Sequence, residues 1–355
     1  MATLSYHEQK DIENIKKLRE LQKELPSFCS DFFRGIETST STRTRIAYAY
    51  DLKIFFQFLK TANPGTFDNP SHTLTPSDLE KLTVTDLEEY IDYLKCHPSD
   101  TNEDVINTER GLMRKVSSLR SFYSYFFRNE LIEKNPAALV RMPKLHEKEI
   151  IRLEIDEVAK LLDEVEEGDK LTEKQKLYHE RTKVRDLAMM SLLLGTGIRV
   201  SECVGLDIND IDFKNGGIHI HRKGGKEVTV YFGTEVETAL QDYLDERNDI
   251  IPEEGSENAL FLSLQKKRMN VRSVENLVKK YAKIVTPLKK ITPHKLRSTY
   301  GTNLYRETGD IYLVADVLGH SDVNTTKKHY AALEDERRRS ARNAVKLREN
   351  QGITP

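Results

Sequence analysis

The sequence predicts a mainly α-helical fold with one small antiparallel β element, divided between two domains. A length of 355 residues suggests two domains. With 38% hydrophobic and 32% charged residues, the composition fits a helix-rich protein with much exposed surface. Apolar residues recur at helical spacing in both halves, whereas "GIHIHRKGGKEVTVYF" alternates on either side of a Gly-Gly pair, which is typical of a hairpin.

The first half reads as a helical domain over residues 1–140, in which residues 1–37 are an extra helical segment. Residues 8–25 carry Ile12, Ile15, Leu18 and Leu25 at helical spacing before Pro26. The Ser/Thr-rich "TSTSTRTR" offers N-caps for a second helix, and residues 63–78 read as a loop from their Pro, Gly and Asn content. A short helix over 83–95 and a long amphipathic one in "NTERGLMRKVSSLRSFYSYFFRNELI" complete a domain that we expect to be all-helical.

The second half predicts an α+β domain over residues 153–355 that is dominated by helices and ends in a helical tail. Before it, "EKNPAALVRMPKLHEKEI" has two prolines with flanking charge, and we expect an interdomain linker at 141–152. The stretch "RDLAMMSLLLGTGIRVSECVGL" predicts a buried helix, a Gly-Thr-Gly turn and a second helix, and the hairpin follows.

Composition also excludes several classes of protein. No apolar run approaches the roughly 20 residues that span a bilayer, and the N-terminus has no secretory h-region. Cys29, Cys96 and Cys203 are scattered and odd in number, which argues against a disulfide framework and suggests a cytoplasmic protein. No Cys/His cluster has zinc-site spacing, so we expect no metal and no cofactor.

Charge is segregated along the chain although the net charge is only −2. Residues 266–306 hold 12 Lys/Arg against one acid, Glu275, whereas residues 154–169 hold eight acids and one lysine. Such a distribution is compatible with one basic face and an acidic back. The alternative is that the basic stretch is only a solvated helix.

Six residues stand out by type and order, although each alone has an ordinary structural reading. A Gly-rich turn in "GTGIRVSE" usually caps a helix, a hairpin lysine is commonly a surface charge, and a lone Tyr before a charged helix is usually a packing residue. In "TPHKLRSTYGT", a helix after Pro293 would place a His and an Arg three residues apart on one face. The ordered set is Arg199, Lys223, His294, Arg297, His320 and Tyr330.

That ordered set resembles the catalytic set of the tyrosine recombinases, the phage integrase and Xer family. The motifs "TGIRVSE", "HKLRST" and "LGHSDVNTT" are similar to the family's boxes in wording, order and spacing. "TRTRIAYAYDLKIFFQFL" and "RKVSSLRSFYSYF" resemble its helical, SAM-like core-binding domain, and the second half resembles its catalytic domain. The likeness runs from about Thr42 to about Glu334. The gap of ten between His320 and Tyr330 departs from the nine of many Xer relatives.

The resemblance implies site-specific strand exchange through a 3′-phosphotyrosyl intermediate and a Holliday junction. It also implies a homotetramer on two paired double-stranded sites, with the two domains closing as a clamp on DNA in a nucleoid-associated, cytoplasmic protein. Tyr330 would be the nucleophile, Lys223 the acid that protonates the leaving 5′ oxygen and His294 the base or proton manager. His320 would hydrogen-bond the phosphate. Tyr300 and Tyr305 read better as core or backbone contacts.

The chemistry suits two arginines, because guanidiniums neutralise a developing phosphate charge bidentately. We expect Arg199 and Arg297 to point into a DNA-filled cleft, and Glu202, one helical turn after Arg199, to orient an active-site arginine. Phosphate and other DNA contacts are expected from basic residues of both domains: Arg43, Arg45, Arg110, Arg114, Lys115, Arg120, Lys226 and Lys295.

Two other functions remain open at this point. A type IB topoisomerase uses similar chemistry without pairing two sites, and a DNA-binding regulator could carry a degenerate site. The sequence names no target site and no accessory factor. It also leaves open chromosome dimer resolution, phage integration and transposon movement.

Overall fold

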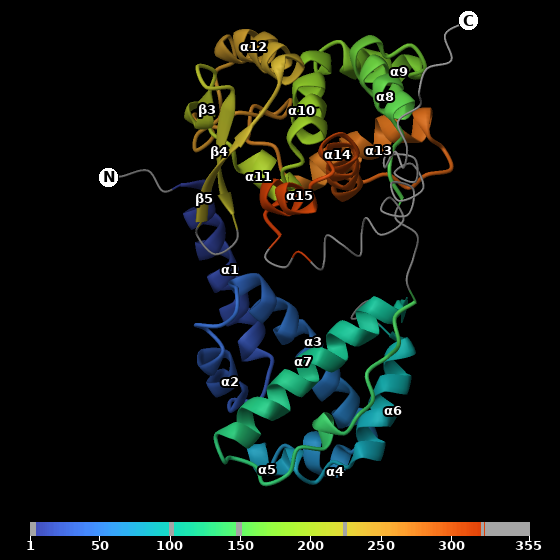
Figure 1. Cartoon of the computed structure of the whole chain (residues 1–355). Helices are drawn as coiled ribbons and strands as arrows, with labels where there is room; N and C mark the ends of the chain where they lie inside the picture. The colour runs from blue at the N-terminus through green and yellow to red at the C-terminus, as the bar shows by residue number, and fades with distance from the viewer. Residues whose placement is uncertain (1–4, 99–102, 147–150, 223–225, 321–322, 324–355) are drawn as a thin grey trace, which may run out of the picture. The chain divides into compact units, whose positions relative to one another are not determined.

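The computed structural model of the chain divides into two compact units, residues 1–148 and 149–355 (Figure 1). The structure describes residues 5–98, 103–146, 151–222, 226–320 and 323. Within these residues, no helix combines the length and the apolar composition that crossing a membrane requires. The predicted helical tail lies outside them.

Unit 1 is built mainly of helices whose starts are fixed by hydroxyl caps. Ser5, Ser41, Thr83 and Thr108 each accept a hydrogen bond from a backbone N–H in the first turn of the helix that follows. The elements are α1 (Tyr6–Lys23), α2 (Cys29–Gly35), α3 (Thr42–Ala62), α4 (Pro64–Phe67), α5 (Pro76–Leu79), α6 (Val84–Lys95), β1 (Cys96–Pro98), β2 (Asp104–Ile106), α7 (Glu109–Arg128) and the 3₁₀ turn η1 (Pro136–Ala138).

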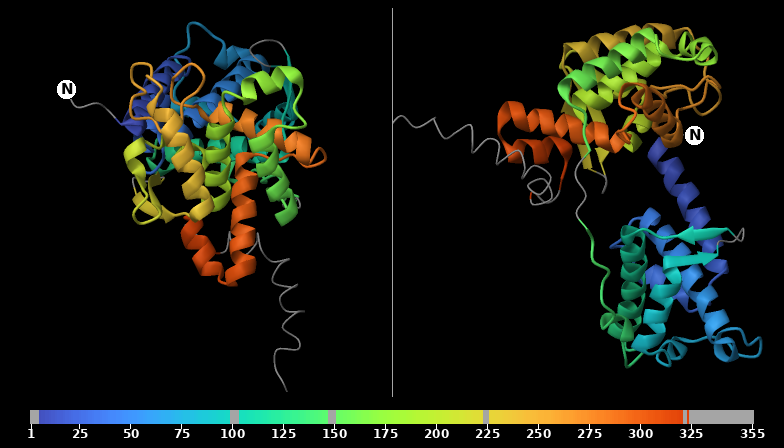
Figure 2. Two further views of the ribbon diagram at one scale, coloured as in Figure 1. Left: turned by 90° about the horizontal axis from the view of Figure 1, so that it is seen from above. Right: turned by 90° about the vertical axis from the view of Figure 1, so that its right-hand side faces the viewer.

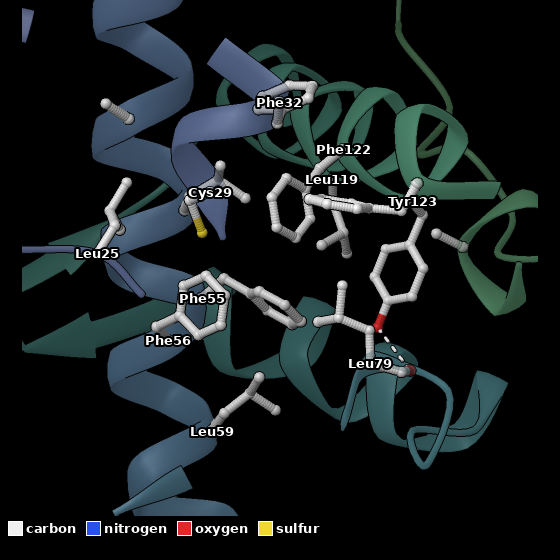
Figure 3. Close-up of a cluster of buried hydrophobic side chains, with 14 of the residues drawn as sticks. Leu25, Cys29, Phe32, Phe55, Phe56, Leu59, Leu79, Leu119, Phe122 and Tyr123 are labelled. Carbon is white, nitrogen blue, oxygen red and sulfur yellow. Dashed lines mark hydrogen bonds between the residues drawn. The ribbon is translucent and has the colours of Figure 1, made fainter. Parts of the chain in front are cut away.

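An aromatic core joins these helices (Figure 3). Phe122 of α7 lies at its centre, with ring centroids 5.2 Å from Phe32 of α2 and 5.0 Å from Phe126. Edge-to-face rings at such distances add stability beyond the area they bury. The Tyr123 hydroxyl donates to the carbonyl of Leu79 at 3.3 Å, so this buried polar group is satisfied and α5 is tied to α7.

The expectation of an all-helical first domain is wrong in one respect. Strands β1 and β2 pair antiparallel, with Cys96 opposite Ile106 and Pro98 opposite Asp104. The single-turn helix α4 also lies within the predicted 63–78 loop, and a second, α5, begins in it. In α1, Ile12 and Ile15 are 41% and 36% exposed, so the predicted apolar stripe is buried only from Leu18 onward.

Unit 2 surrounds a buried central helix, α10 (Lys183–Thr196), which packs against α8 (Ile155–Glu167), α12 (Thr234–Asn248) and α14 (Pro293–Thr308). A three-stranded antiparallel sheet, in the order β3 (Ile211–Asp212), β4 (Gly217–Arg222), β5 (Lys226–Tyr231), contains the predicted hairpin. In both views of Figure 2, α14 and α15 (Ile311–Leu318) lie side by side. The remaining elements are α9 (Glu173–His179), α11 (Val200–Gly205), the 3₁₀ turn η2 (Ile208–Asp210) and α13 (Val271–Val285).

Candidate active site

Arg199 is positioned by the turn between α10 and α11. Gly197 ends α10 with φ 64°, and a Cβ there would lie 2.3 Å from Cδ1 of Tyr300, so both the backbone angle and the space favour glycine. The chain then turns, and Arg199 becomes the N-cap of α11. Its backbone N donates to Oε2 of the buried Glu202 at 2.7 Å, and its Nη1 donates to Oε1 at 2.7 Å. Glu202 therefore holds both the main chain and the guanidinium of Arg199, whose side chain remains 38% exposed.

Arg297 lies near the start of α14, which begins with Pro293 at its first position. Its Nη1 donates to the carbonyl of Gly197 at 2.6 Å, and its Nη2 donates to the carbonyl of Leu318. Only 4% of the residue is exposed. The expectation that Arg297 points into an open cleft therefore does not hold in this structure. The guanidinium instead joins the turn after α10 to the end of α15.

The C-terminal end of α15 is where three arginines meet. The last carbonyls of a helix lack intrahelical partners and carry partial negative charge, so cations are favoured there. Gly319 ends the helix with φ 61°, and its backbone N donates to the Asp316 carbonyl at 2.8 Å. The arginine cluster, as we name Arg199, Arg222 and Arg297, donates to four successive carbonyls: Arg222 to Asp316 at 3.2 Å and Val317 at 2.5 Å, Arg297 to Leu318, and Arg199 to Gly319 at 3.3 Å.

The histidines lie close to this cluster in the chain. His320, half-buried, directly follows Gly319, and its backbone N donates to the carbonyl of Ala315 at 2.9 Å. His294 is exposed on the first turn of α14, and Lys295 beside it is half-buried. The spacing correctly predicted one helix for His294 and Arg297, although one is exposed and the other buried.

The expected nucleophile, Tyr330, and the expected general acid, Lys223, lie outside the described residues. Lys226 is exposed on β5, opposite Arg222 in the hairpin register. The other tyrosines near the motifs belong to the packing between α14 and α15. Tyr305 is buried in the hydrophobic packing between these two helices. Burial raises the pKa of Tyr300, which is half-buried.

In unit 1, two of the predicted DNA contacts are buried. Arg45 is 8% exposed and donates through Nη1 to Oε1 of Glu37 at 2.7 Å. Lys115, equally buried, donates to Oδ1 of Asn107 at 2.9 Å. Both cations thus form contacts within unit 1. No signal in the sequence distinguishes a cation with this structural role from one that contacts DNA.

Arg114 and Arg120 also bind their own chain. The Nη1 of Arg114 donates to Oδ2 of buried Asp51 at 2.5 Å. Burial nevertheless raises the pKa of Asp51 to about 6. Arg120 donates to three carbonyls at and after η1, those of Ala137, Ala138 and Val140. Of the predicted contacts in this unit, Arg43 and Arg110 are the exposed ones with no ion pair among the described residues.

Arg222 is the residue of the arginine cluster that the motifs did not single out. It is the last residue of β4 and sits beside Lys223 in the hairpin. Nothing in "HRKGGK" indicates that its partners lie about 95 residues further along the chain, at the end of α15.

Comparison with known proteins supplies a family. Residues 152–337 match the model of the phage integrase family. Among curated proteins, the tyrosine recombinase XerC of Caldanaerobacter subterraneus subsp. tengcongensis is 36% identical over 331 residues, covering 90% of this chain and 86% of that protein. The tyrosine recombinase XerS of Streptococcus thermophilus is 30% identical over 357 residues, covering 93% and 98%.

Solved structures share the fold at low sequence identity. The Tn1549 transposon integrase in complex with a circular intermediate DNA aligns with a TM-score of 0.61 at 18% identity, covering 88% of this chain and 99% of that one. The XerH recombinase bound to a palindromic difH substrate aligns with a TM-score of 0.60 at 17% identity, covering 85% and 79%. These likenesses confirm the predicted fold class. The family match and the identity to the Xer recombinases along most of the sequence lead to one conclusion: the chain belongs to the phage integrase family.

Proposed function

We propose that this protein is a site-specific DNA recombinase that cleaves and rejoins strands through a 3′-phosphotyrosyl intermediate and a Holliday junction. The observation that carries the proposal is the convergence of motifs far apart in sequence. Arg199 and Arg297 both donate to the end of α15, the helix that leads directly into His320. The similarity to proteins named tyrosine recombinase XerC and XerS supports it.

The two arginines supply charge where the reaction develops it. A phosphodiester is already an anion, and attack on it concentrates further negative charge on the non-bridging oxygens. Guanidiniums fixed in advance stabilise that charge without reorganising at the moment of reaction. Glu202 holds Arg199 by two contacts of 2.7 Å, which supplies such preorganisation.

Tyr330 and Lys223 carry out the covalent step as nucleophile and general acid. The Tyr330 oxygen forms a bond to the scissile phosphorus, and the bond to the 5′ oxygen breaks as Lys223 donates a proton to it. The phosphotyrosine conserves the bond energy, so a 5′ hydroxyl can later attack it and restore the backbone. His294 manages the tyrosine proton and His320 donates to the phosphate. Tyr330 needs this assistance because an unperturbed tyrosine has a pKa near 10.

A nicked suicide substrate tests the function. Cleavage next to a nick releases a short oligonucleotide, so religation fails and the protein stays covalently attached. The proposal expects a stable adduct, and complete recombinant products on two intact sites from a homotetramer. An adduct accompanied by relaxation of supercoils at unrelated sequences would favour a topoisomerase. Binding without any adduct would favour a regulator.

The role of Lys223 has its own test. A 5′-phosphorothiolate at the scissile bond gives a leaving group that needs no protonation. Lys223→Ala should therefore cleave this substrate at nearly the wild-type rate while failing on the normal one. Equal failure on both substrates, with normal binding, would limit Lys223 to electrostatic stabilisation.

A further inference from the structure

Arg222 donates to two successive main-chain carbonyls at the end of α15. Its Nη1 donates to the Asp316 carbonyl at 3.2 Å and its Nη2 to the Val317 carbonyl at 2.5 Å. Its Nε is buried and has no hydrogen-bond partner among the described residues. Burial lowers the pKa of this guanidinium, which is half-buried. Because removing a charge from water is costly unless it is hydrogen-bonded, the two carbonyl acceptors stabilise this guanidinium.

The approach of Arg222 depends on Gly319. A Cβ at this position would lie 2.3 Å from Nη1 and 2.6 Å from Cζ of Arg222. The φ of 61° independently favours glycine. The main chain just before His320 is therefore shaped to lie against the guanidinium of Arg222.

The three arginines of the cluster differ in whether they must also bind the scissile phosphate. Arg199 and Arg297 hold the carbonyls of Gly319 and Leu318, the two nearest His320. In the proposed reaction, the guanidinium groups of Arg199 and Arg297 must also donate to the scissile phosphate. Arg222 holds Asp316 and Val317, which lie further back along the helix, and can keep both when the other two guanidiniums also donate to the phosphate.

We propose that Arg222 is a positioning residue, which anchors the C-terminal end of α15 and so keeps His320 in place while Arg199 and Arg297 engage the scissile phosphate. This role rests on the proposed recombinase function. Arg222 itself need not touch DNA, so its loss should slow cleavage of bound DNA without weakening the binding.

Cleavage at saturating protein, in a single turnover on the nicked substrate, measures the effect. Hydrogen bonds to a charged group are strong enough that Arg222→Gln should slow cleavage by about 10- to 100-fold. Arg222→Lys retains the charge but cannot reach both carbonyls with a planar fork, so it should recover part of the rate. The Kd for an intact site should stay within about threefold of wild type. A rate for Arg222→Gln within twofold of wild type overturns the proposal.

Arg247 supplies a matched control. This α12 arginine is buried and likewise donates to main-chain carbonyls, those of Glu257 at 2.9 Å and Ala259 at 3.1 Å. Arg247→Gln should lower Tm while leaving single-turnover cleavage unchanged well below the melting temperature. If it slows cleavage as much as Arg222→Gln, the effect of Arg222 is general destabilisation and the proposal is wrong.

A measurement without DNA checks the anchoring directly. The backbone N–H groups of Gly319 and His320 donate to Asp316 and Ala315. In the full chain, hydrogen exchange across residues 311–320 should be faster in Arg222→Gln than in Arg247→Gln. Equal protection overturns the anchoring.

Two glycine variants separate backbone strain from loss of the Arg222 contact. Gly319→Ala should reproduce the slow cleavage of Arg222→Gln. Gly255 has a similar positive φ of 79°, and a Cβ there would have nothing within 4 Å. Gly255→Ala should therefore not slow cleavage. If both alanines cleave at the wild-type rate, the close approach at Gly319 is unimportant and the proposal fails. If wild-type protein forms no adduct at all, the recombinase function fails first. If wild type and Arg222→Gln form the adduct at the same rate, only the role of Arg222 is rejected.

Discussion

The two units use arginine in different ways. In unit 1, Arg45, Arg114 and Arg120 each bind a separate partner, respectively Glu37, Asp51 and the carbonyls around η1. In unit 2, the arginine cluster converges on the C-terminal end of one helix. Dispersed arginines brace helices against one another, whereas convergent ones concentrate positive charge at one place.

This difference shows why one kind of sequence evidence was more informative than the other. Counting basic residues in unit 1 cannot separate a cation that faces solvent from one that pairs with its own chain, because both look alike in sequence. Ordered spacing in unit 2 constrains type and position together. The predictions below test whether catalysis depends on the convergent arginines and affinity on the exposed ones.

The largest expected effect is loss of the nucleophile. Tyr330→Phe should abolish the covalent adduct on the suicide substrate while leaving affinity for an intact site nearly unchanged, because only the attacking oxygen is removed. Denaturing electrophoresis of labelled DNA detects the adduct. Tyr300→Phe is the control and should still form it. An adduct retained in Tyr330→Phe would redirect attention to Tyr300 or Tyr305.

The next effect concerns the convergent arginines. Arg199→Ala and Arg297→Ala should each slow cleavage about 100- to 1000-fold, as removal of one oxyanion donor does. They should differ in stability, because Arg297 is 4% exposed and satisfies the Gly197 and Leu318 carbonyls, whereas the Arg199 side chain is 38% exposed. Arg297→Ala should therefore also lower the free energy of unfolding by about 1–3 kcal/mol. Equal melting temperatures for the two variants would contradict this structural role of Arg297.

Local signals were sufficient for many of the longer helices, for the β4–β5 hairpin and for one contact at the site. Pro293 marks the start of α14, and the three-residue spacing from Arg199 to Glu202 leads to an observed contact. The burial of Arg297 depends on Leu318, 21 residues away, and that of Arg222 on α15, so no local pattern predicts either. Strands β1 and β2 are three residues each, too short to establish an alternating pattern.

A smaller effect should separate burial from pairing at Asp51 in unit 1. Burial raises the pKa of Asp51 from 3.8 to about 6, against the opposing influence of Arg114. The folded state then binds the proton more tightly than the unfolded state, so stability from this group falls as pH rises from about 4 to about 6. Asp51→Asn should gain up to about 3 kcal/mol relative to wild type over that range, measured by calorimetry.

The Arg114 variant sharpens that result. Arg114→Ala removes the cation that favours the charged carboxylate, so the pKa of Asp51 should rise further. The loss of stability with rising pH should then extend to higher pH. If wild type instead gained stability over Asp51→Asn as pH rose, the ion pair would outweigh burial.

The smallest effects belong to the exposed arginines of unit 1. Arg43 and Arg110 are exposed, and each phosphate contact releases about one counterion, so Arg43→Ala or Arg110→Ala should reduce the slope of log affinity against log salt by about one. Neither should change Tm. Arg120→Ala is the counterpart: it removes donors to the Ala137, Ala138 and Val140 carbonyls and should lower Tm with the salt slope retained. Titration of a labelled site at several salt concentrations gives the slopes. If Arg120→Ala lowered the slope as much as Arg110→Ala, the braced arginines of unit 1 would contact DNA as well, and the contrast between the two units would be one of geometry alone.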